Sequence, residues 1–353
     1  MWAKDWKNTS YWLDGQPALS GISQTIIPDV DVLVVGSGYT GLHAAIQILR
    51  GGRKVMIIDS GAPGFGCSTR NGGQISTSIK PSQAKLARKF GTRRATAIRQ
   101  EGETALDWIE DFITGEKIDC AFERCGRFHA AHSEAHFQTL AKDAEALSKF
   151  ENIAVEIIPK ADQKKELGSD LRHASVHPAK YHHGLLQLAL EAGAHVVGQC
   201  RAERINKTSA GFEIQTTQGQ VTCKDVVVAT NGYTGNLTPW LQRRVIPIGS
   251  YIIATEPLQP ELMEKLFPTN RIISDTCKVV YYYRPSPDKT RILFGGRVSA
   301  RETDPSASGP KLHNDMCRIF PELKETKISH SWMGTVAYTF DELAHTGCHQ
   351  GIY

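Results

Sequence analysis

Three glycines, at positions 36, 38 and 41, form a G-x-G-x-x-G pattern, and Asp59 lies 23 residues after the first of them. Residues of these types at this spacing can bind a dinucleotide. The first glycine permits a tight turn, the second lets the backbone approach a pyrophosphate, and the third lets a helix pack closely on a strand. The carboxylate can accept hydrogen bonds from ribose hydroxyls. A glycine-rich turn that binds nothing is the alternative, so the flanking elements decide.

The flanking elements fit the binding interpretation. Residues 31–35 are an almost unbroken apolar run, which is typical of a strand buried on both faces of a parallel sheet. Residues 42–49 carry apolar side chains at helical spacing, and the glycines at 51–52 end that helix. Residues 54–59 form a second apolar run that ends on the acid. The segment therefore predicts one βαβ unit, with a helix N-terminus placed to stabilise a phosphate.

Two further segments distinguish between dinucleotides. Residues 64–74, GFGCSTRNGGQ, follow the acidic strand end and are rich in glycine and small polar residues, so their backbone can run under an extended cofactor. A nicotinamide enzyme usually continues here straight into a helix and a strand. Residues 226–235 read as a buried strand ending in a second glycine turn. An NAD(P)-dependent dehydrogenase and an ordinary mobile surface loop at 64–74 remain as alternatives.

The remaining elements suggest two interleaved domains of an α/β protein, α+β overall. Helices are expected over 81–114, 134–150 and 180–192, and strands over 122–130, 154–158, 194–197, 211–217 and 220–230. Alternating apolar residues over 247–298 predict an antiparallel sheet. We expect an N-terminal extension at 1–27, a Rossmann-type domain at 28–84, 175–245 and 326–353, and a substrate domain at 85–174 and 246–325.

Composition excludes several classes of protein. The net charge is +4 with 41% hydrophobic residues, and basic segments alternate with apolar ones, so nucleic acid is not an expected partner. No stretch approaches the roughly 20 apolar residues of a membrane-spanning helix. The eight cysteines lack zinc spacing and no secretory signal precedes them, which predicts no metal site, reduced thiols and a cytoplasmic location. The aromatic residues near the N-terminus are expected to pack on the protein body.

The order of these segments resembles the FAD-dependent D-amino acid oxidase, glycine oxidase and sarcosine oxidase superfamily, and most of all its bacterial gamma-glutamylputrescine oxidase group. The segments that carry the resemblance span nearly the whole chain: GSGYTGLHAA (36–45), GFGCSTRNGGQ (64–74), VHPAKYHHGL (176–185), VVVATNGYTG (226–235), RVIPIGSYIIATEPL (244–258), VVYYYRPSPDKTRILFGGR (279–297) and WMGTVAYTFDELAHTG (332–347).

The resemblance implies non-covalently bound FAD and assigns its contacts. The turn that would hold the pyrophosphate comprises Gly36, Ser37, Gly38, Tyr39, Thr40 and Gly41. Asp59 and Ser60 would lie at the adenosine ribose, and Ala202 near the adenine. The segment that would pass near the flavin ring comprises Ser68, Thr69, Arg70, Asn71, Gly72, Gly73 and Gln74. Asn231 and Gly232 would close over the cofactor.

The chain departs from the family in two places. Amino-acid-oxidising members carry a carboxylate-binding Arg just after the glycine of a W-x-G-type segment, whereas here Trp332-Met333-Gly334 is followed by Thr335. This favours an amine without a free α-carboxylate near the flavin, although Arg284 or Arg297 could supply a cation. The family also continues past Tyr353 with a strand, a glycine-rich turn and a helix. C-terminal truncation is therefore expected, and a catalytically inactive flavoprotein fragment stays an open alternative.

The expected reaction is hydride transfer from the α-carbon of a neutral, small amine to the flavin. The imine then hydrolyses to an aldehyde, and dioxygen, or a quinone, accepts the electrons, with hydrogen peroxide as the product when the acceptor is dioxygen. Tyr251, Tyr281, Tyr283 and Arg284 are candidates for the substrate pocket, with cross-strand packing as the alternative for the tyrosines. Strand alternation puts Tyr282 on the face opposite Tyr281 and Tyr283. The oligomeric state and the particular amine are not fixed by the sequence.

Two smaller points remain open. His182 and His183 are adjacent on the expected helix and point apart, so surface or helix-packing positions are favoured over a metal or catalytic role. Cys67 lies in the glycine-rich loop, either near the flavin ring or as a small buried residue.

Overall fold

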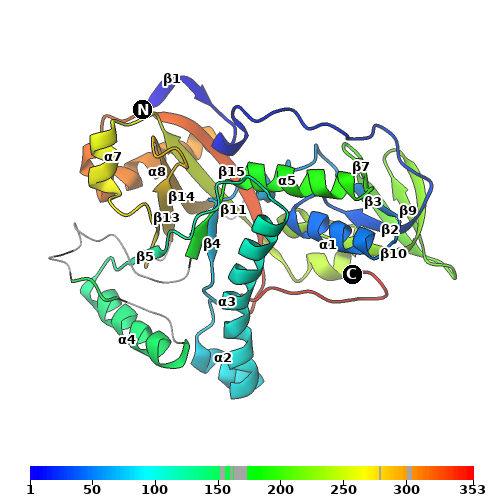
Figure 1. Ribbon diagram of the computed structural model, residues 1–353, viewed down its shortest axis with the longest axis horizontal. Helices are drawn as coiled ribbons and strands as arrows, with labels where there is room; N and C mark the ends of the chain where they lie inside the picture. Colours follow the sequence, from blue (N-terminus) through cyan, green and yellow to red (C-terminus); the bar gives the residue numbers. More distant parts are fainter. Residues whose placement is uncertain (152–155, 160–161, 163–172, 278–279, 300–303) are drawn as a thin grey trace. The chain divides into compact units, whose positions relative to one another are not determined.

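The computed structural model describes residues 1–151, 156–159, 162, 173–277, 280–299 and 304–353 (Figure 1). The chain divides into two compact units, each built from separated segments. The first unit comprises residues 1–14, 71–177 and 249–333, and the second comprises residues 15–70, 178–248 and 334–353. The assignment of the interleaved segments to an FAD-binding and a substrate domain remains a prediction; the compact units change over at 70/71 and divide the N-terminal extension at 14/15.

The second unit is built on a six-stranded sheet in the order β7-β3-β2-β10-β9-β8. Its strands are β7 (His195–Val197), β3 (Val55–Ile58), β2 (Asp29–Val35), β10 (Gly219–Val228), β9 (Phe212–Thr216) and β8 (Ala202–Lys207). The first four are parallel, and β9 and β8 continue the sheet as an antiparallel meander. Helices α1 (Tyr39–Arg50) and α5 (Pro178–Glu191) pack against each other (Figure 1).

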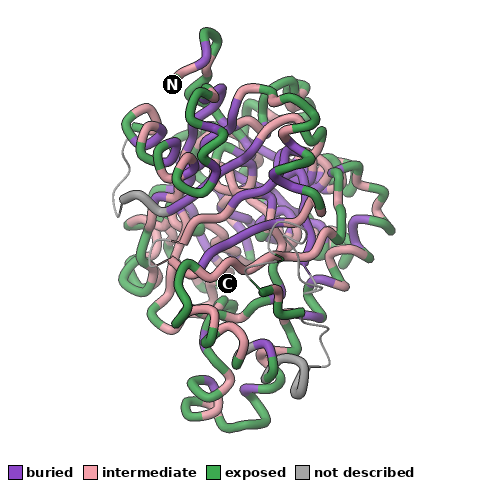
Figure 2. The backbone as a smooth tube through the Cα atoms, turned by 90° about the vertical axis from the view of Figure 1, so that its left-hand side faces the viewer, coloured by how far each residue is buried: buried purple, intermediate pink, exposed green. Residues whose placement is uncertain are grey.

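The apolar runs explain this sheet. Residues Val32 to Val34 and the whole of β3 are buried, as a parallel sheet covered on both faces requires. Figure 2 shows the buried stretches of the chain in purple and the exposed ones in green. At the chain end, Tyr353 continues the sheet: its N–H donates to the Val226 carbonyl, and its own carbonyl accepts from Val228 N–H, at 2.9 and 2.7 Å.

The first unit contains a seven-stranded sheet in the order β1-β15-β11-β14-β13-β12-β5. Its strands are β1 (Trp2–Lys7), β15 (Ile328–Tyr338), β11 (Ile246–Thr255), β14 (Ile292–Ser299), β13 (Tyr281–Pro285), β12 (Ile272–Asp275) and β5 (Arg127–Ala130). The pairs β11/β14, β14/β13 and β13/β12 are antiparallel, as alternation over 247–298 predicts, whereas β1 and β5 add parallel edges. A two-stranded sheet joins β4 (Gln74–Ser76) to β6 (His173–Ser175).

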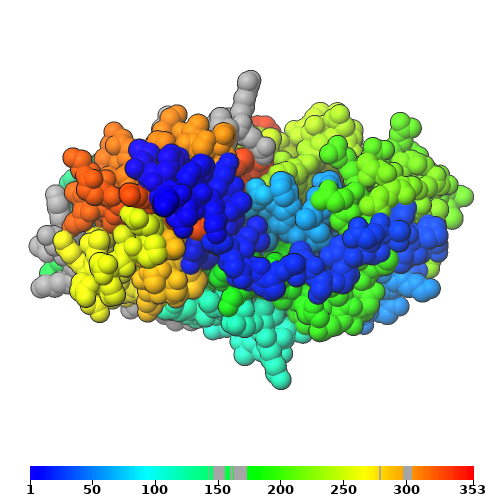
Figure 3. Space-filling model, turned by 90° about the horizontal axis from the view of Figure 1, so that it is seen from above, coloured from blue at the N-terminus to red at the C-terminus, as the bar shows by residue number. Residues whose placement is uncertain are grey.

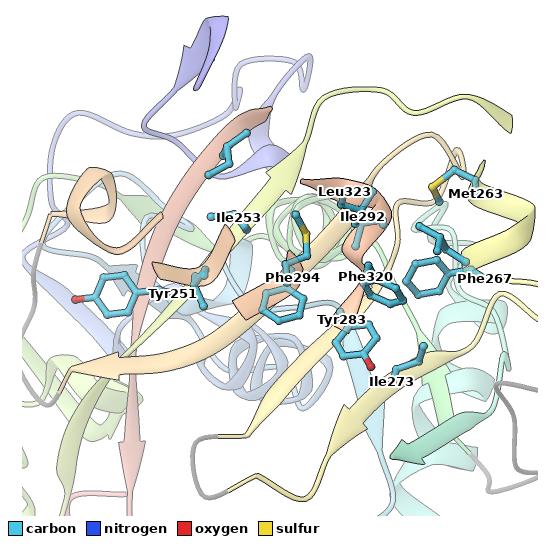
Figure 4. Packing of buried hydrophobic residues seen from close by; sticks show 14 residues of the cluster. Tyr251, Ile253, Met263, Phe267, Ile273, Tyr283, Ile292, Phe294, Phe320 and Leu323 are labelled. Atoms are coloured by element: carbon cyan, nitrogen blue, oxygen red, sulfur yellow. The ribbon is translucent and has the colours of Figure 1, made fainter. Parts of the chain in front are cut away.

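One face of this sheet carries the hydrophobic core of the unit (Figure 4). Tyr283 and Phe294 stack with ring centroids 5.4 Å apart, and Phe320 meets Tyr283 edge to face at 5.4 Å. Helices α7 (Pro260–Leu266) and α8 (Pro305–Ile319) contribute Met263, Leu312 and other apolar side chains to the same cluster.

The N-terminal residues pack on this unit, as their aromatic content predicts. Trp2 reaches α8, where a Cβ added at Gly309 would lie 2.4 Å from its ring. The dark-blue start of the chain lies at the surface beside orange residues in Figure 3. The short 3₁₀ helix η1 (Tyr11–Leu13) then buries Trp12 completely.

The helical prediction for 81–114 needs a correction. The segment forms two helices, α2 (Gln83–Phe90) and α3 (Thr92–Gly115), because Gly91 between them takes φ of +80°. Helix α4 (Glu134–Glu151) matches its expected range. The strand expected over 122–130 is shortened to β5, and the strand expected over 154–158 lies partly outside the described residues.

Three further 3₁₀ helices and a short α-helix complete the description: η2 (Cys67–Thr69), η3 (Asn231–Tyr233), η4 (Pro321–Leu323) and α6 (Pro239–Gln242). Within the described ranges, no helix is long and apolar enough to cross a membrane.

Candidate functional site

The turn between β2 and α1 needs glycine at two positions for different reasons. Gly36 has φ of +108°, and a Cβ there would lie 2.6 Å from the Ala229 carbonyl oxygen. A Cβ at Gly41 would lie 1.9 Å from the Gly36 carbonyl oxygen. Both obstacles are backbone atoms, so a side chain at either position forces the strand, the turn or the helix to move.

The N-terminus of α1 suits an anion. The N-cap residue Gly38 has no side chain to cap the helix, and the first turn carries no acidic residue. The Ser68 hydroxyl accepts from the Tyr39 N–H at 3.0 Å, and a Cβ at Gly38 would lie 2.9 Å from that hydroxyl oxygen. The positive end of the helix dipole, with Thr40 and Gly41 in its first turn, is therefore oriented to stabilise a pyrophosphate.

Asp59 fixes this turn at the end of β3. One carboxylate oxygen accepts from the Ser37 N–H and hydroxyl at 2.9 and 2.6 Å, and the other accepts from the Gly61 N–H at 3.0 Å. A carboxylate has about four lone-pair positions, so capacity for one ribose hydroxyl remains. Cys200 N–H donates to the Asp59 carbonyl at 2.7 Å, which brings the start of β8, with Ala202, close to this strand end. Ser60 is exposed beside it.

The glycine-rich loop begins against α5. Gly64 has φ of +79°, and a Cβ there would lie 2.6 Å from the His182 ring. The Gly64 carbonyl accepts from the Thr69 hydroxyl at 2.6 Å, which closes the loop on itself. The Arg70 guanidinium lies over the Phe65 ring at 4.3 Å.

The helix-packing position favoured for His182 is confirmed, but its contact with the dinucleotide turn was not predicted. Its Nε2–H donates to the Ser37 carbonyl at 2.8 Å, and burial lowers its pKa to about 4, so the imidazole is neutral at physiological pH. Its Nδ1 is buried without a hydrogen-bond partner among the described residues. The HPAKYHH motif predicted a helix but held no signal that His182 faces the turn while His183 is half-exposed.

The second glycine turn closes on the end of β15. Asn231, with φ of +47°, accepts from the Ala337 N–H through Oδ1 at 2.9 Å. A Cβ at Gly232 would lie 2.8 Å from the Thr335 carbonyl oxygen, which also accepts from the Cys67 thiol at 3.0 Å. Residues 64–70, 231–233 and 334–337 thus form one packed group of loops in the second unit.

The end of the glycine-rich loop belongs to the first unit and lies against β13. A Cβ at Gly72 would lie 2.8 Å from the Tyr282 ring, and the Gln74 side-chain amide donates to the Tyr283 carbonyl at 3.3 Å. The Tyr282 hydroxyl is 2.8 Å from the Ser250 hydroxyl. The tyrosine that faces the loop is therefore Tyr282, which was left out of the predicted pocket.

The candidates on the opposite face of β13 need correction. Tyr283 is 4% exposed and stacks in the core, and Tyr251 is 1% exposed in the same cluster. Tyr281 also stacks on Phe294, and its hydroxyl donates to Asp315 at 2.8 Å. The prediction that Tyr281 and Tyr283 share a face is confirmed, but that face is the hydrophobic core.

Arg284 is likewise engaged within the protein. It is 5% exposed, and its guanidinium donates to the Gly73, Val176 and Pro285 carbonyls at 2.7, 3.1 and 3.1 Å. It is therefore not placed to receive a substrate carboxylate. The Arg297 side chain lies outside the described residues.

The residues present fit FAD. The turn at 36–41 provides a cradle that Cβ atoms would fill, the first turn of α1 carries no acidic residue, and Asp59 stands at the strand end. In the part of the chain that the structure describes, no group of three or more His, Cys, Asp or Glu residues could hold a metal ion.

Comparison with known proteins agrees with this geometry. The family model described as FAD dependent oxidoreductase (DAO) matches residues 31–353. The chain is 31% identical to a probable oxidoreductase, OrdL, of Rhizobium meliloti, over 88% of this chain and 73% of that protein. It is 30% identical to gamma-glutamylputrescine oxidoreductase of Escherichia coli, over 90% and 76% respectively.

Among solved structures, glycine oxidase from Geobacillus kaustophilus superposes with a TM-score of 0.75 at 17% identity, covering 92% of this chain and 88% of that one. L-proline dehydrogenase from P. horikoshii superposes with a TM-score of 0.72 at 16% identity, covering 92% and 86%. These similarities concern the fold. The family match and the two curated relatives, together with the fitted FAD cradle, show that the chain belongs to the DAO family of FAD-dependent oxidoreductases.

Proposed function

We propose that this flavoprotein oxidises a small amine that carries no free α-carboxylate at the reacting carbon, of the gamma-glutamylputrescine type. The observation that carries the proposal is that two described positions considered for a carboxylate-binding cation do not provide one. Thr335, not an Arg, follows the glycine of Trp332-Met333-Gly334, and Arg284 donates to backbone carbonyls. The relative from Escherichia coli named gamma-glutamylputrescine oxidoreductase supports the substrate class.

The flavin, when bound, supplies the acceptor for a hydride from the α-carbon of the amine. The protein's own residues bind and orient the cofactor and the amine. We propose that the turn at 36–41 holds the pyrophosphate, that Asp59 binds the adenosine ribose, and that Ser60 and Ala202 lie beside the adenosine. Residues 68–74 pass the flavin ring, and Asn231 and Gly232 close over the cofactor.

We assign the substrate side to Tyr282. Its ring lies on Gly72 and Gly295, and its hydroxyl pairs with Ser250. A tyrosine in this position presents an apolar surface to the carbon chain of an amine and a hydroxyl to its nitrogen. The proposed hydride transfer needs little acid–base catalysis from the protein, because an amine that binds in its neutral form needs no dedicated base. The imine product hydrolyses in water.

We further propose dioxygen as the electron acceptor, with hydrogen peroxide as the product, and a quinone as the alternative acceptor. A cytoplasmic location is supported by the eight cysteines, all of which are free thiols.

The test is the visible absorbance spectrum of the purified chain after FAD is added and unbound FAD is removed by gel filtration. Retained flavin bands that bleach anaerobically with gamma-glutamylputrescine, but not with glycine, sarcosine or proline, are the expected result. Bleaching by the amino acids alone would overturn the substrate assignment. A protein that retains no FAD would contradict oxidase activity in this chain.

A further inference from the structure

The N-terminal segment reaches the end of the glycine-rich loop through one residue. Trp12 is completely buried, and its indole N–H donates to the Asn71 carbonyl at 2.7 Å. The His177 ring meets the indole edge to face at 5.0 Å, which fixes its orientation. A residue of the first 14 positions thus holds the backbone of a loop 59 positions further along the chain.

A closed set of contacts links Asn71 through Gly73 and Arg284 back to Trp12. Asn71 Oδ1 accepts from the Gly73 N–H at 2.9 Å. The Gly73 carbonyl accepts from Arg284 Nη1 at 2.7 Å and from the Val176 N–H at 2.9 Å. The Arg284 guanidinium in turn lies over the indole of Trp12, 5.7 Å from its centroid, so the contacts end at the residue where they began.

This arrangement selects one of the backbone conformations that glycine can adopt. Gly73 takes φ of +65°, which glycine adopts about as readily as a negative φ, so the contacts around it determine the choice. Burial lowers the pKa of Arg284 to about 10, so the guanidinium remains charged at neutral pH. Three carbonyl dipoles and the indole face stabilise this buried cation, and moving the loop end would remove part of that stabilisation.

We propose that Trp12 and Arg284 are positioning residues for the flavin: they hold residues 71–73 in the conformation that meets the ring. The inference rests on the proposed role of residues 68–74 in flavin binding. It extends the cofactor site to the N-terminal segment, which precedes the dinucleotide motif. Simple packing would require a buried ring at position 12, whereas positioning requires the N–H donor aimed at Asn71.

The discriminating variant is Trp12→Phe, which keeps a buried ring under Arg284 and removes the donor. The matched control is Trp6→Phe, because Trp6 stacks on Trp2 at 4.4 Å in the same segment and a phenyl ring retains that contact. Three quantities are measured: the melting temperature, amide hydrogen exchange of the apo-protein over residues 68–76, and the FAD dissociation constant with the visible circular dichroism of the bound flavin.

Trp12→Phe is expected to raise exchange at 71–74 selectively and to weaken FAD binding about tenfold, by loss of one hydrogen bond to a half-buried carbonyl. The flavin dichroism should change at saturating FAD, and Trp6→Phe should match the wild type in all three measurements. If Trp12→Phe does not fold, Asn71→Ala serves instead, because it removes the acceptor of the Gly73 N–H. It is judged by the same measurements.

The outcomes separate the two claims. Wild-type FAD binding with no difference between Trp12→Phe and Trp6→Phe would overturn the positioning role and leave the proposed function intact. Equal exchange increases throughout the chain would also overturn it, because they indicate general destabilisation. A wild-type chain that binds no FAD would overturn the proposed function and this inference together.

Discussion

Replacing Gly64 by alanine tests the contact between the glycine-rich loop and α5. The added Cβ would lie 2.6 Å from His182 Cε1 and 2.9 Å from Nδ1, and the residue has φ of +79°. The imidazole cannot simply swing away, because its Nε2–H is bonded to the Ser37 carbonyl at 2.8 Å. Gly64→Ala should therefore strain the loop and the dinucleotide turn together.

The magnitude has two parts. The positive φ costs about 1–2 kcal/mol for a non-glycine residue. Displacing His182 leaves the buried Ser37 carbonyl without its donor, which costs roughly 1–3 kcal/mol. We expect Gly64→Ala to lower the free energy of unfolding by about 3 kcal/mol and to weaken FAD binding at least tenfold. Gly52→Ala measures the cost of the positive φ alone, since Gly52 has the same φ of +79° and nothing lies within 4 Å of its added Cβ.

The assay is urea unfolding at neutral pH, with FAD affinity measured by flavin fluorescence, for Gly64→Ala, His182→Ala and the double variant. Because His182→Ala removes the obstructing ring, the double variant should be more stable than the sum of the single effects by about 1–2 kcal/mol. Strict additivity, or a Gly64→Ala effect no larger than that of Gly52→Ala, would refute the proposed contact.

Three other predictions concern the turn, the substrate side and pH. Gly41→Ala should abolish FAD retention in gel filtration, because its Cβ would lie 1.9 Å from a carbonyl oxygen, whereas Gly115→Ala, with open space around it, should retain FAD; equal retention would contradict the turn geometry. Tyr282→Phe should raise KM for the amine about tenfold with little change in kcat, by loss of one hydrogen bond; an unchanged KM in steady-state kinetics would remove Tyr282 from the substrate side. Burial lowers the pKa of His43 and His173 to about 4 and 3, below the value near 6.5 of an unfolded chain. As the pH falls, the unfolded state therefore binds protons before the folded state does. The melting temperature should stay nearly constant above pH 6.5 and fall as the pH drops toward 4. A melting temperature that does not change between pH 6.5 and 4 would contradict the buried neutral state.

Sequence reasoning worked best where a requirement is local. The strand at 31–35, the turn glycines and the acid at Asp59 are close in the chain, and each has a backbone reason to be that residue type. Periodicity also predicted the shared face of Tyr281 and Tyr283. The break at Gly91 within the predicted 81–114 helix was missed, because apolar spacing continues across it while φ of +80° interrupts the helix.

The substrate side could not be predicted in the same way. Alternation divides the tyrosines of β13 into two faces, but it does not say which face is the core. That choice depends on Phe294, Phe320 and the helices that cover one side of the sheet, all distant in sequence from Tyr282. For the same reason Arg284 looked like an available cation, although the carbonyls that engage it come from residues 73 and 176.

Tyr282, His182 and Trp12 share one property that explains why their contacts with the cofactor loop and turn were not predicted. Each contacts the glycine-rich loop at 64–74, and His182 also contacts the turn at 36–41. The contacts are Tyr282 at Gly72, His182 at Gly64 and Ser37, and Trp12 at Asn71. A glycine-rich loop has few side chains of its own to fix its path, so part of its conformation must come from such neighbours. The loop motif therefore predicted the cofactor, whereas the surrounding side chains, contributed by three separate parts of the chain, fix the path of the loop.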